Sequence, residues 1–327
     1  MSNRQITIAL DAMGGDDSPY KNLKGAEIFL KNNPNVNLLI FGDKNEILNS
    51  IKIYNIELNK SEIINCTENV LDEDNASTIL RSRKNSSIYK GLSFVKENSD
   101  TGFVSAGNTA ALMILSRFIL GMIGGIDRPA ICSKIPNKKS FSLMMDLGAN
   151  VQVTASNLMQ FAFMGISYFS IIEPNRIPKI GLVNIGTENN KGLEFLQEAH
   201  ALISNSTLKN NFIGFVEPNK ITKGVCDIIL SDGYTGNIIL KTAEGFSEFI
   251  TTNLKNVFIK SFKNKISYKI LEKDLKIFKN QIDPDEYNGA ALLGLNGISV
   301  KSHGGASPHA FSCAINNCYD FILNDLN

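Results

Sequence analysis

The chain has 327 residues, 43% of them hydrophobic, and a formal net charge of +1 at pH 7. This content suffices for a large core, and the near-neutral charge excludes a general attraction to nucleic acid, so we expect no nucleic-acid partner. The five cysteines are widely spaced and odd in number, which favours reduced thiols over a disulfide framework.

At the amino terminus, Met1–Arg4 lead directly into an apolar strand pattern, without the apolar region and cleavage site of a secretory leader. We therefore expect a cytoplasmic protein. The most apolar stretches, Ala110–Ile123 and Leu158–Ile172, contain polar interruptions and do not reach the roughly 20 apolar residues of a membrane-spanning helix. They are predicted to be buried helices.

One unit recurs along the chain: a short apolar run, a polar loop rich in Gly, Asn, Asp or Ser, and a segment with helical spacing. The predicted strands are Ile6–Leu10, Leu38–Phe41, Gly102–Val104, Ser142–Met145, Ile180–Val183, Asp227–Leu230 and Ile298–Lys301, and the helices after them begin near Pro19, Glu46, Thr109, Thr154, Lys191, Asn237 and Ala306. This order predicts one α/β domain over residues 1–327, with a mainly parallel sheet and helices on both faces.

The loops after these strands carry most of the unusual polar residues. They are Asp11–Asp16 with Gly14 and Gly15, Ser105–Asn108, Asp146–Asn150, Asn184–Glu188 with Gly186, Ser231–Asn237 and His303–Ser307. Ligands of open parallel sheets bind beyond the carboxyl ends of the strands. We therefore expect these loops at one edge of the sheet, and the functional site among them.

The loop Ser105–Thr109 has the composition of an anion site. Gly107 permits a sharp turn, Asn108 or Thr109 can cap the following helix, and backbone N–H groups are free at the positive end of its dipole. The alternative is that every strand-to-helix junction needs a small residue and a cap.

Two further junctions repeat this design. Asp232–Asn237 contains Gly233 and Gly236, and Asn184–Gly192 adds Lys191. Three such loops favour a binding site for phosphate or carboxyl oxygens over loops that only connect a strand to a helix.

Two groups of basic residues also suit a phosphate. Arg128 precedes Pro129, whose fixed φ would hold its backbone, and a planar guanidinium matches phosphate oxygens. Arg83 and Lys84 form the second group. Surface positions or a solvated helix face explain both groups equally well.

The region around His303 also contains His309, Cys313 and Cys318, but this order fits no usual zinc spacing, so we predict no metal site. His303 can instead act as a hydrogen-bond donor or acid. The sequence has no Walker A loop, no G-x-G-x-x-G in its first turn and no Gly-x-Ser-x-Gly. We expect neither a cofactor nor a covalent acyl-enzyme.

Residues 244–282 are predicted to form a helical arm, because their apolar residues recur at steps of three and four. Eight lysines lie between 255 and 279, against Glu272 and Asp274. Such a basic amphipathic segment can lie on an anionic membrane or receive an acidic carrier protein. The alternative is a dimer-forming helix pair with a solvated lysine face.

Seven segments occur in an order that resembles a known family. They are Ile8–Pro19, Val104–Thr109, Arg128–Ile131, Asp146–Asn150, Asn184–Gly186, Ser231–Asn237 and Lys301–Gly305. Together they resemble the PlsX phosphate acyltransferases of bacterial phospholipid synthesis. Thr187–Asn190, Gln152 and Asn288 depart from the family's usual pattern.

The resemblance implies a homodimer with an isocitrate/isopropylmalate-dehydrogenase-like α/β fold, related to phosphotransacetylases. It implies conversion of acyl-[acyl-carrier-protein] and phosphate into acyl phosphate, which a membrane glycerol-3-phosphate acyltransferase then consumes. It also implies peripheral membrane contact, which suits the lysine-rich arm.

A direct attack of phosphate on a thioester needs a phosphate cradle, donors to the developing oxyanion and positioning groups. We assign the cradle to Gly107, Asn108, Thr109 and Arg128, the oxyanion contacts to Asn184, Asn237 or His303, and orientation to Asp11, Asp146 and Asp232. The substrate-binding set is completed by Gly14, Gly15, Ser105, Asn150, Gly186, Lys191, Gly233 and Gly236.

Three other functions compete with this one. A phosphotransacetylase-like enzyme would use another acyl thioester. An NAD-dependent decarboxylating dehydrogenase would need a metal-binding carboxylate cluster and a Tyr–Lys arrangement, which the sequence does not display. A non-catalytic scaffold would bind lipid or carrier protein through the arm.

Overall fold

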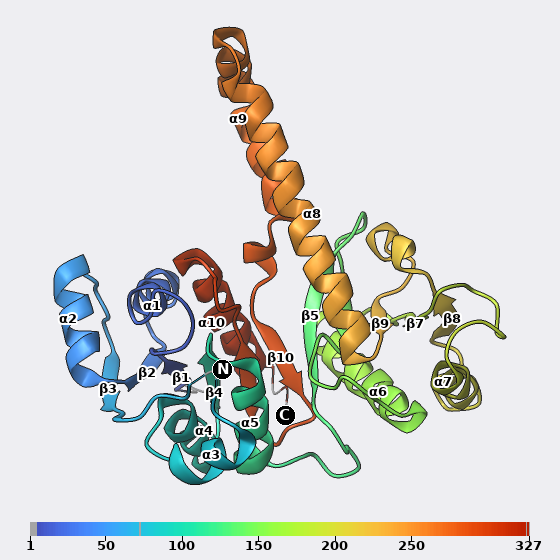
Figure 1. Ribbon diagram of the computed structural model, residues 1–327, viewed down its shortest axis with the longest axis horizontal. Coiled ribbons are helices and arrows are strands. Elements are labelled where there is room, and N and C mark those ends of the chain that lie inside the picture. Colours follow the sequence, from blue (N-terminus) through green and yellow to red (C-terminus); the bar gives the residue numbers. More distant parts are fainter. Residues whose placement is uncertain (1–4, 72, 325, 327) are drawn as a thin grey trace.

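The computed structural model describes residues 5–71, 73–324 and 326. Among these residues, eleven strands form one sheet in the order β3-β2-β1-β4-β11-β10-β5-β6-β9-β7-β8 (Figure 1). The strands are β1 (Thr7–Asp11), β2 (Asn37–Gly42), β3 (Ser61–Asn65), β4 (Thr101–Ser105), β5 (Ala130–Pro136), β6 (Phe141–Met145), β7 (Ile180–Val183), β8 (Phe212–Val216), β9 (Ile228–Leu230), β10 (Ala290–Leu293) and β11 (Ile298–Lys301). The predicted α/β class with a mainly parallel sheet is confirmed.

Helices cover both faces of this sheet. They are α1 (Tyr20–Asn32), α2 (Lys44–Tyr54), α3 (Ala76–Ser82), α4 (Ser87–Glu97), α5 (Thr109–Leu120), α6 (Ala155–Ile172), α7 (Glu194–Ser204), α8 (Gly233–Ile259), α9 (Phe262–Ile282) and α10 (Pro308–Leu323), with short 3-10 turns η1 (Pro218–Lys223) and η2 (Pro284–Tyr287). One core contains residues of α1, α6, α7 and α10, and a second contains residues of α4 and α5.

The two cores explain why the strands are continuous apolar runs. Along β1, Ile8 and Leu10 belong to the first core, whereas Ala9 between them belongs to the second. Successive side chains of a strand point to opposite faces, so a sheet covered on both sides buries every position. Full burial of one such aliphatic side chain contributes roughly 1.5–3 kcal/mol.

The strand directions divide the sheet into two halves. The strands β1, β2, β3, β4 and β11 are parallel to one another, and so are β6, β7, β8 and β9. Three antiparallel pairings, β11–β10, β10–β5 and β5–β6, separate the two sets. The sets therefore run in opposite directions, and the prediction that all the polar loops share one edge of the sheet is wrong.

The seven predicted strands are confirmed within one residue at either end, but four others were missed. The strands β3 and β8 are the two edges of the sheet, where burial is incomplete and the apolar pattern is weak. The strands β5 and β10 are the antiparallel centre and are followed by no helix-initiating loop of the predicted kind.

Among the described residues, α6 is the one helix with the length and apolar composition to cross a membrane. Half of its residues are nevertheless buried inside the protein. Phe161, Ala162 and Phe169 on this helix are fully buried in the first core. It is thus a helix of the protein core, as the polar interruptions predict.

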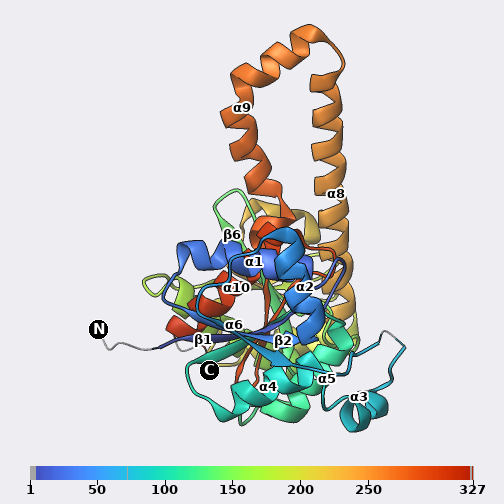
Figure 2. The same ribbon diagram turned by 90° about the vertical axis from the view of Figure 1, so that its left-hand side faces the viewer.

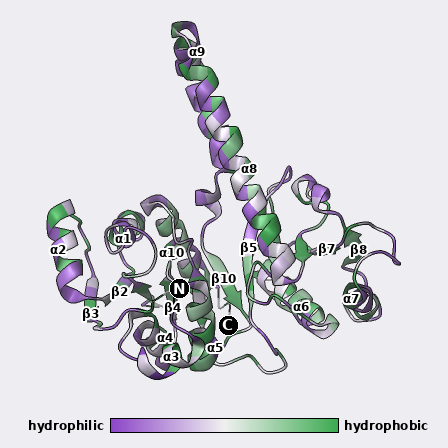
Figure 3. Ribbon diagram, in the orientation of Figure 1, coloured by the Kyte–Doolittle hydropathy of each residue, from purple (hydrophilic) through white to green (hydrophobic). Residues whose placement is uncertain are grey.

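The predicted arm projects from the body as the outer part of α8 together with α9 (Figures 1 and 2). Apolar and polar residues alternate along it (Figure 3). The rings of Phe258 and Tyr268 lie 5.6 Å apart and join the two helices near their connection. None of the α9 residues is buried, and Phe262 and Ile270 are 79% and 76% exposed.

Candidate functional site

The carboxylate of Asp11 joins the loops that follow β1 and β4. The hydroxyl of Ser105 donates to Oδ2 of Asp11 over 2.6 Å and accepts from the backbone N–H of Gly107 at 3.0 Å. A Cβ atom on Gly14 would lie 2.4 Å from the nitrogen of Gly107 and 2.5 Å from the Asp11 carboxylate. The absence of a side chain at Gly14 therefore lets these two loops touch. The sequence did not predict this contact between Gly14 and Gly107.

Asp11 is buried, and its surroundings act on its pKa in two directions. Burial raises the pKa of the carboxyl group, while hydrogen bonds from Ser105, Ser87 and the backbone of Met13 and Gly14 lower it. Its oxygens are thus held by neighbouring donors, which suits the positioning role assigned to Asp11.

The next residues begin α5 as predicted. The side chain of Asn108 accepts from the backbone N–H of Ala111 at 3.0 Å and so caps the helix whose first residue is Thr109. Asn108 and Thr109 are therefore positioned at the positive end of the helix dipole, close to Gly107.

A third loop, between β11 and α10, meets the first one. The backbone N–H of Asp16 donates to the carbonyl of Gly304 at 2.9 Å, and the ammonium group of Lys21 donates to the same carbonyl. Gly15 has a φ of +81°, and a Cβ atom there would lie 2.7 Å from the Gly304 oxygen. Only glycine allows this approach without strain.

Asn288 fixes the start of the same loop. Its side-chain amide donates to the hydroxyl of Ser302 at 2.8 Å and to the carbonyl of Ala310 at 2.7 Å, and it accepts from the backbone N–H of His303 at 3.0 Å. The Asn288 side chain therefore makes three contacts that hold the loop carrying His303.

One buried lysine, Lys21, and one partly buried lysine, Lys301, lie beside these loops, and neither was predicted from the sequence. Lys21 is 3% exposed, and Lys301, the last residue of β11, donates to the carbonyl of Ser302. Burial lowers the pKa of Lys301 to about 8; Lys21 and Lys241 act in the same direction, against Asp11. Burial also lowers the pKa of Lys21, against Asp16 and Asp17. A lysine that ends an apolar strand is the signal that could have identified Lys301.

Helix α8 connects this region with the other half of the sheet. It begins directly after β9, and Nζ of its residue Lys241 lies 2.9 Å from Nε2 of His303. Lys241 also pairs with Glu244 at 2.8 Å. Burial lowers the pKa of His303, and Lys241, Lys301 and Lys21 lower it further, against Glu244.

The loops after β6 and β9 form a second group. Asp146 is buried and accepts hydrogen bonds from the backbone of Ile131, Gly148, Ala149 and Asn150 and from the Asn150 side chain, at 2.7–3.2 Å. Burial raises its pKa, against these hydrogen bonds. Asp146 and Asn150 therefore hold the loop itself, rather than offering free oxygens or amides to a ligand.

The start of α8 packs tightly on this loop. A Cβ atom on Gly233 would lie 2.6 Å from the carbonyl oxygen of Asn150, and one on Gly236 would lie 1.9 Å from that of Asp146. Asp232 caps the helix by accepting from the backbone N–H of Thr235 at 2.8 Å. These three residues are explained by packing and capping.

Asn237 lies between the two groups. Its side chain is next to Gly148, where a Cβ atom would be 3.6 Å from it, and it forms no hydrogen bond with a described residue. Asn237 is exposed and precedes Lys241 by four residues, so the two share one face of α8. This face leads from the second group of loops to His303.

The loop after β7 is closed on itself. The Asn184 amide donates to the carbonyl of Lys191 at 2.9 Å, and its oxygen accepts from the N–H of Ile185 at 2.9 Å. Lys191 pairs with Glu188 at 2.7 Å, and both side chains are about half exposed. A Cβ atom on Gly186 would lie 2.7 Å from the Lys191 side chain. No described contact connects this loop with Asp11 or His303.

Arg128 lies two residues before the start of β5, and its side chain is exposed. Its guanidinium group donates to the carbonyl of Gln152 at 3.4 Å. Its contacts place it beside the second group of loops, and none of them joins it to Gly107, Asn108 or Thr109. The four residues assigned to one phosphate cradle are thus divided between two regions. Arg83 is also occupied, because it forms a bidentate pair with Asp74 at 2.8 Å.

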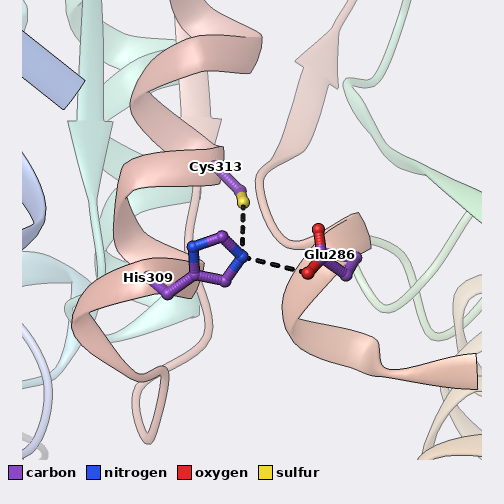
Figure 4. A group of neighbouring side chains, drawn as sticks. All are labelled: Glu286, His309 and Cys313. Carbon is purple, nitrogen blue, oxygen red and sulfur yellow. Dashed lines mark hydrogen bonds and ion pairs between the residues drawn. The ribbon is translucent and has the colours of Figure 1, made fainter. Parts of the chain in front are cut away.

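One group of side chains has the composition to hold a cation, although the sequence spacing predicted no metal. Nε2 of His309 lies 3.1 Å from Glu286 and 3.8 Å from Sγ of Cys313 (Figure 4). Burial raises the pKa of Cys313 to about 11, and Glu286, Asp285 and Asp283 raise it further. A cation bound there would have to displace the proton of this thiol.

Comparisons with known proteins identify the family of this chain. Residues 6–327 match a family described as "Fatty acid synthesis protein". The phosphate acyltransferase of Clostridium tetani is 41% identical, covering 98% of this chain and 97% of that protein. The phosphate acyltransferase of Legionella pneumophila (strain Paris) is 40% identical, covering 99% and 97%.

Solved structures show the fold. A phosphotransacetylase from Streptococcus pyogenes has a TM-score of 0.63 at 17% identity and covers 98% of this chain and 94% of that one. A branched-chain phosphotransacylase from Enterococcus faecalis V583 has a TM-score of 0.60 at 14% identity, covering 97% and 99%. The expected relation to the phosphotransacetylase fold is confirmed.

The family match spans almost the whole chain, and relatives of 40–41% identity cover nearly all of it. The protein belongs to the PlsX family of phosphate acyltransferases.

Proposed function

We propose that this acyltransferase moves an acyl group from acyl-[acyl-carrier-protein] to inorganic phosphate, and that the resulting acyl phosphate supplies phospholipid synthesis in the cytoplasm. Its family makes it an enzyme of acyl and phosphate transfer. The carrier protein as donor and the phospholipid pathway are our extension of that membership.

The chemistry needs no enzyme nucleophile. A phosphate oxygen attacks the thioester carbonyl carbon, the C–O bond forms, and a tetrahedral oxyanion results. When the oxyanion collapses, the C–S bond breaks with its electron pair on sulfur, and the proton of hydrogen phosphate ends on the released thiol. Phosphate is already anionic and a thiolate is a fair leaving group, so positioning and oxyanion donors account for the catalysis.

The observation that carries this proposal is the meeting of three loops around Asp11. The Asp11–Ser105 hydrogen bond and the contact of Gly14 with Gly107 join two of them, and the Gly304 carbonyl joins the third. The β4 loop leads into the amino terminus of α5, and the β11 loop carries His303. Among the proposed oxyanion donors, His303 is exposed beside Lys241 of α8 and Asn237 is exposed on α8 itself, whereas the Asn184 amide is occupied within its own loop.

The decisive experiment measures thioester loss from a purified acyl-[acyl-carrier-protein] with and without phosphate, and traps acyl phosphate with hydroxylamine. We expect loss that depends on phosphate and yields one hydroxamate per thiol released. Loss with acyl-coenzyme A but not with the carrier protein would favour the phosphotransacetylase-like alternative. If neither donor loses its thioester in a phosphate-dependent way, the non-catalytic scaffold would be the remaining alternative.

The proposal includes two kinds of partner surface. The exposed apolar residues and lysines of the arm, 255–279, are suited to an anionic membrane, where a glycerol-3-phosphate acyltransferase would consume the product. The exposed apolar residues of the arm are alternatively suited to contact a second copy of the chain in the expected homodimer. Sedimentation of the purified protein without vesicles measures dimer formation, and sedimentation with anionic vesicles measures membrane binding.

A further inference from the structure

Four basic side chains from four segments of the chain meet beside Asp11. Lys21 comes from α1, Lys301 from the end of β11, His303 from the loop after it, and Lys241 from α8. Lys21 contacts the carbonyl of Gly304, Lys301 contacts that of Ser302, and Lys241 lies 2.9 Å from His303, so all four charges gather around residues 302–304. In agreement, Lys21, Lys241 and Lys301 all lower the pKa of His303. We call these four residues the basic cluster.

Lys21, which is buried, and Lys301, which is partly buried, form no ion pair with a carboxylate of the described residues. The ammonium group of Lys21 donates to the Gly304 carbonyl and that of Lys301 to the Ser302 carbonyl. The nearby Asp11 carboxylate is held by Ser105 and backbone N–H groups instead. Asp16 and Asp17 act on Lys21, and Asp11 acts on Lys301, but none of these carboxylates forms an ion pair with either lysine. Charges removed from water are normally paired, so these incompletely compensated ammonium groups favour the binding of an anion.

His303 adds a second sign of a missing acceptor. Its Nδ1 accepts from the backbone N–H of Gly305 at 3.1 Å, so a neutral ring carries its proton on Nε2. That N–H faces the ammonium group of Lys241 at 2.9 Å, which places two donors against each other. An oxygen of an anion can accept from both and removes the conflict.

The cluster is open to small ligands, because His303 and Lys241 are exposed while Lys21 and Lys301 lie deeper. It also borders the loops of Gly15 and Ser105–Thr109. A tetrahedral oxyanion has enough acceptor oxygens to engage several of these donors together.

We propose that the basic cluster of Lys21, Lys241, Lys301 and His303 binds the phosphate group of the reaction, as inorganic phosphate before transfer and as the phosphoryl end of acyl phosphate after it. This inference rests on the proposed function for its substrate. It moves the phosphate from Arg128 to the lysines, and it leaves the Gly107–Thr109 loop as the neighbouring wall.

The test compares Lys301→Met with Lys134→Met. Lys134 on β5 is also partly buried with a lowered pKa, but it belongs to another region and serves as the matched control. Loss of one charge-assisted contact predicts a rise of about 10- to 100-fold in KM for phosphate, with an unchanged KM for the acyl donor. Lys241→Met is expected to act in the same way, whereas Lys134→Met keeps wild-type values.

A binding measurement separates this inference from the proposed function. Inorganic phosphate alone is expected to raise the melting temperature of the wild-type protein and of Lys134→Met, but not that of Lys301→Met. A phosphate effect that persists unchanged in Lys301→Met and Lys241→Met would overturn the inference, even if acyl phosphate is formed. A wild-type protein that binds phosphate through these lysines but forms no acyl phosphate would refute the proposed function and leave the phosphate site standing.

Discussion

Nζ of Lys241 lies 2.9 Å from Nε2 of His303, and this contact joins the two oppositely directed halves of the sheet. Lys241 belongs to the helix that follows β9, whereas His303 follows β11. The direct contact of these residues brings chemistry from both halves together, although the strands themselves direct their loops oppositely.

Replacement of Asn108 by Leu is expected to abolish acyl phosphate formation while the fold is retained. The change removes the cap of α5, worth about 1 kcal/mol, and places an apolar group beside the proposed phosphate site. Asn75→Leu is the matched control, since Asn75 caps the short helix α3 away from the site. Hydroxamate formation and thermal unfolding of both variants provide the measurement, and full activity of Asn108→Leu contradicts the assignment.

Gly14→Ala is expected to reduce the rate at least 10-fold and to lower the free energy of unfolding by about 1–3 kcal/mol. The new methyl group would overlap the Gly107 nitrogen and the Asp11 carboxylate. Gly124→Ala provides the control, because a Cβ atom there has nothing within 4 Å. Equal behaviour of the two variants in kinetics and urea unfolding would show that the loops do not need this contact.

Lys301→Met is expected to stabilise the protein at pH 7 while weakening phosphate binding. The folded-state pKa of about 8 lies below the ordinary 10.5, so the wild-type fold gains stability as pH rises from 8 to 10.5 and is penalised at pH 7. The penalty is about 3 kcal/mol. Urea unfolding should show that the variant is more stable than the wild type at pH 7 and that this difference is smaller at pH 10. A difference that grows with pH would contradict a lowered pKa of Lys301 in the folded state.

Asp146→Asn is expected to cost about 2–3 kcal/mol of stability, because an amide NH₂ would face N–H donors that the carboxylate now accepts. Asp127→Asn is the control, since Asp127 is exposed and bonds only Gln160 through its side chain. Equilibrium unfolding of both variants decides the point. A variant Asp146→Asn as stable as the wild type would show that the loop does not depend on the charge.

The double variant Phe262→Ser, Ile270→Ser is expected to lose binding to anionic vesicles, since these residues expose 79% and 76% of their surface on the arm. Ile177→Ser is the control, because Ile177 is 84% exposed on the body. Vesicle flotation at low and high salt provides the measurement. Wild-type flotation combined with a loss of dimer would assign this surface to a second copy of the chain.

Much of the fold was predictable because it depends on local chemistry. The apolar run from Ile6 to Leu10, the glycine loop after it and the apolar face of the next helix lie together in sequence, and each has a preferred conformation. The edge strand β3 was not predictable in this way, because Ser61–Asn65 is only partly buried and carries a mixed pattern.

The site was predictable only in part. Asp11, Ser105, Gly107, Asn108 and His303 were named from their loops, and the structure brings them together through the Asp11–Ser105 bond and the β11 loop. Asp146, Asn150 and Gly236 were named by the same reasoning but serve packing. A glycine-rich junction looks alike in sequence whether it binds a ligand or only allows two loops to touch.

The sequence by itself determined the family, the α/β class, the polar loops and the lysine-rich arm, because motifs and periodicity are properties of neighbouring residues. Only the tertiary structure decided that the strands run in two directions, that Arg128 is separate from Asn108, and that Lys21, Lys241 and Lys301 surround His303. Burial and charge proximity arise between residues up to 282 positions apart (Lys21 and His303), and the local sequence pattern contains no information about them.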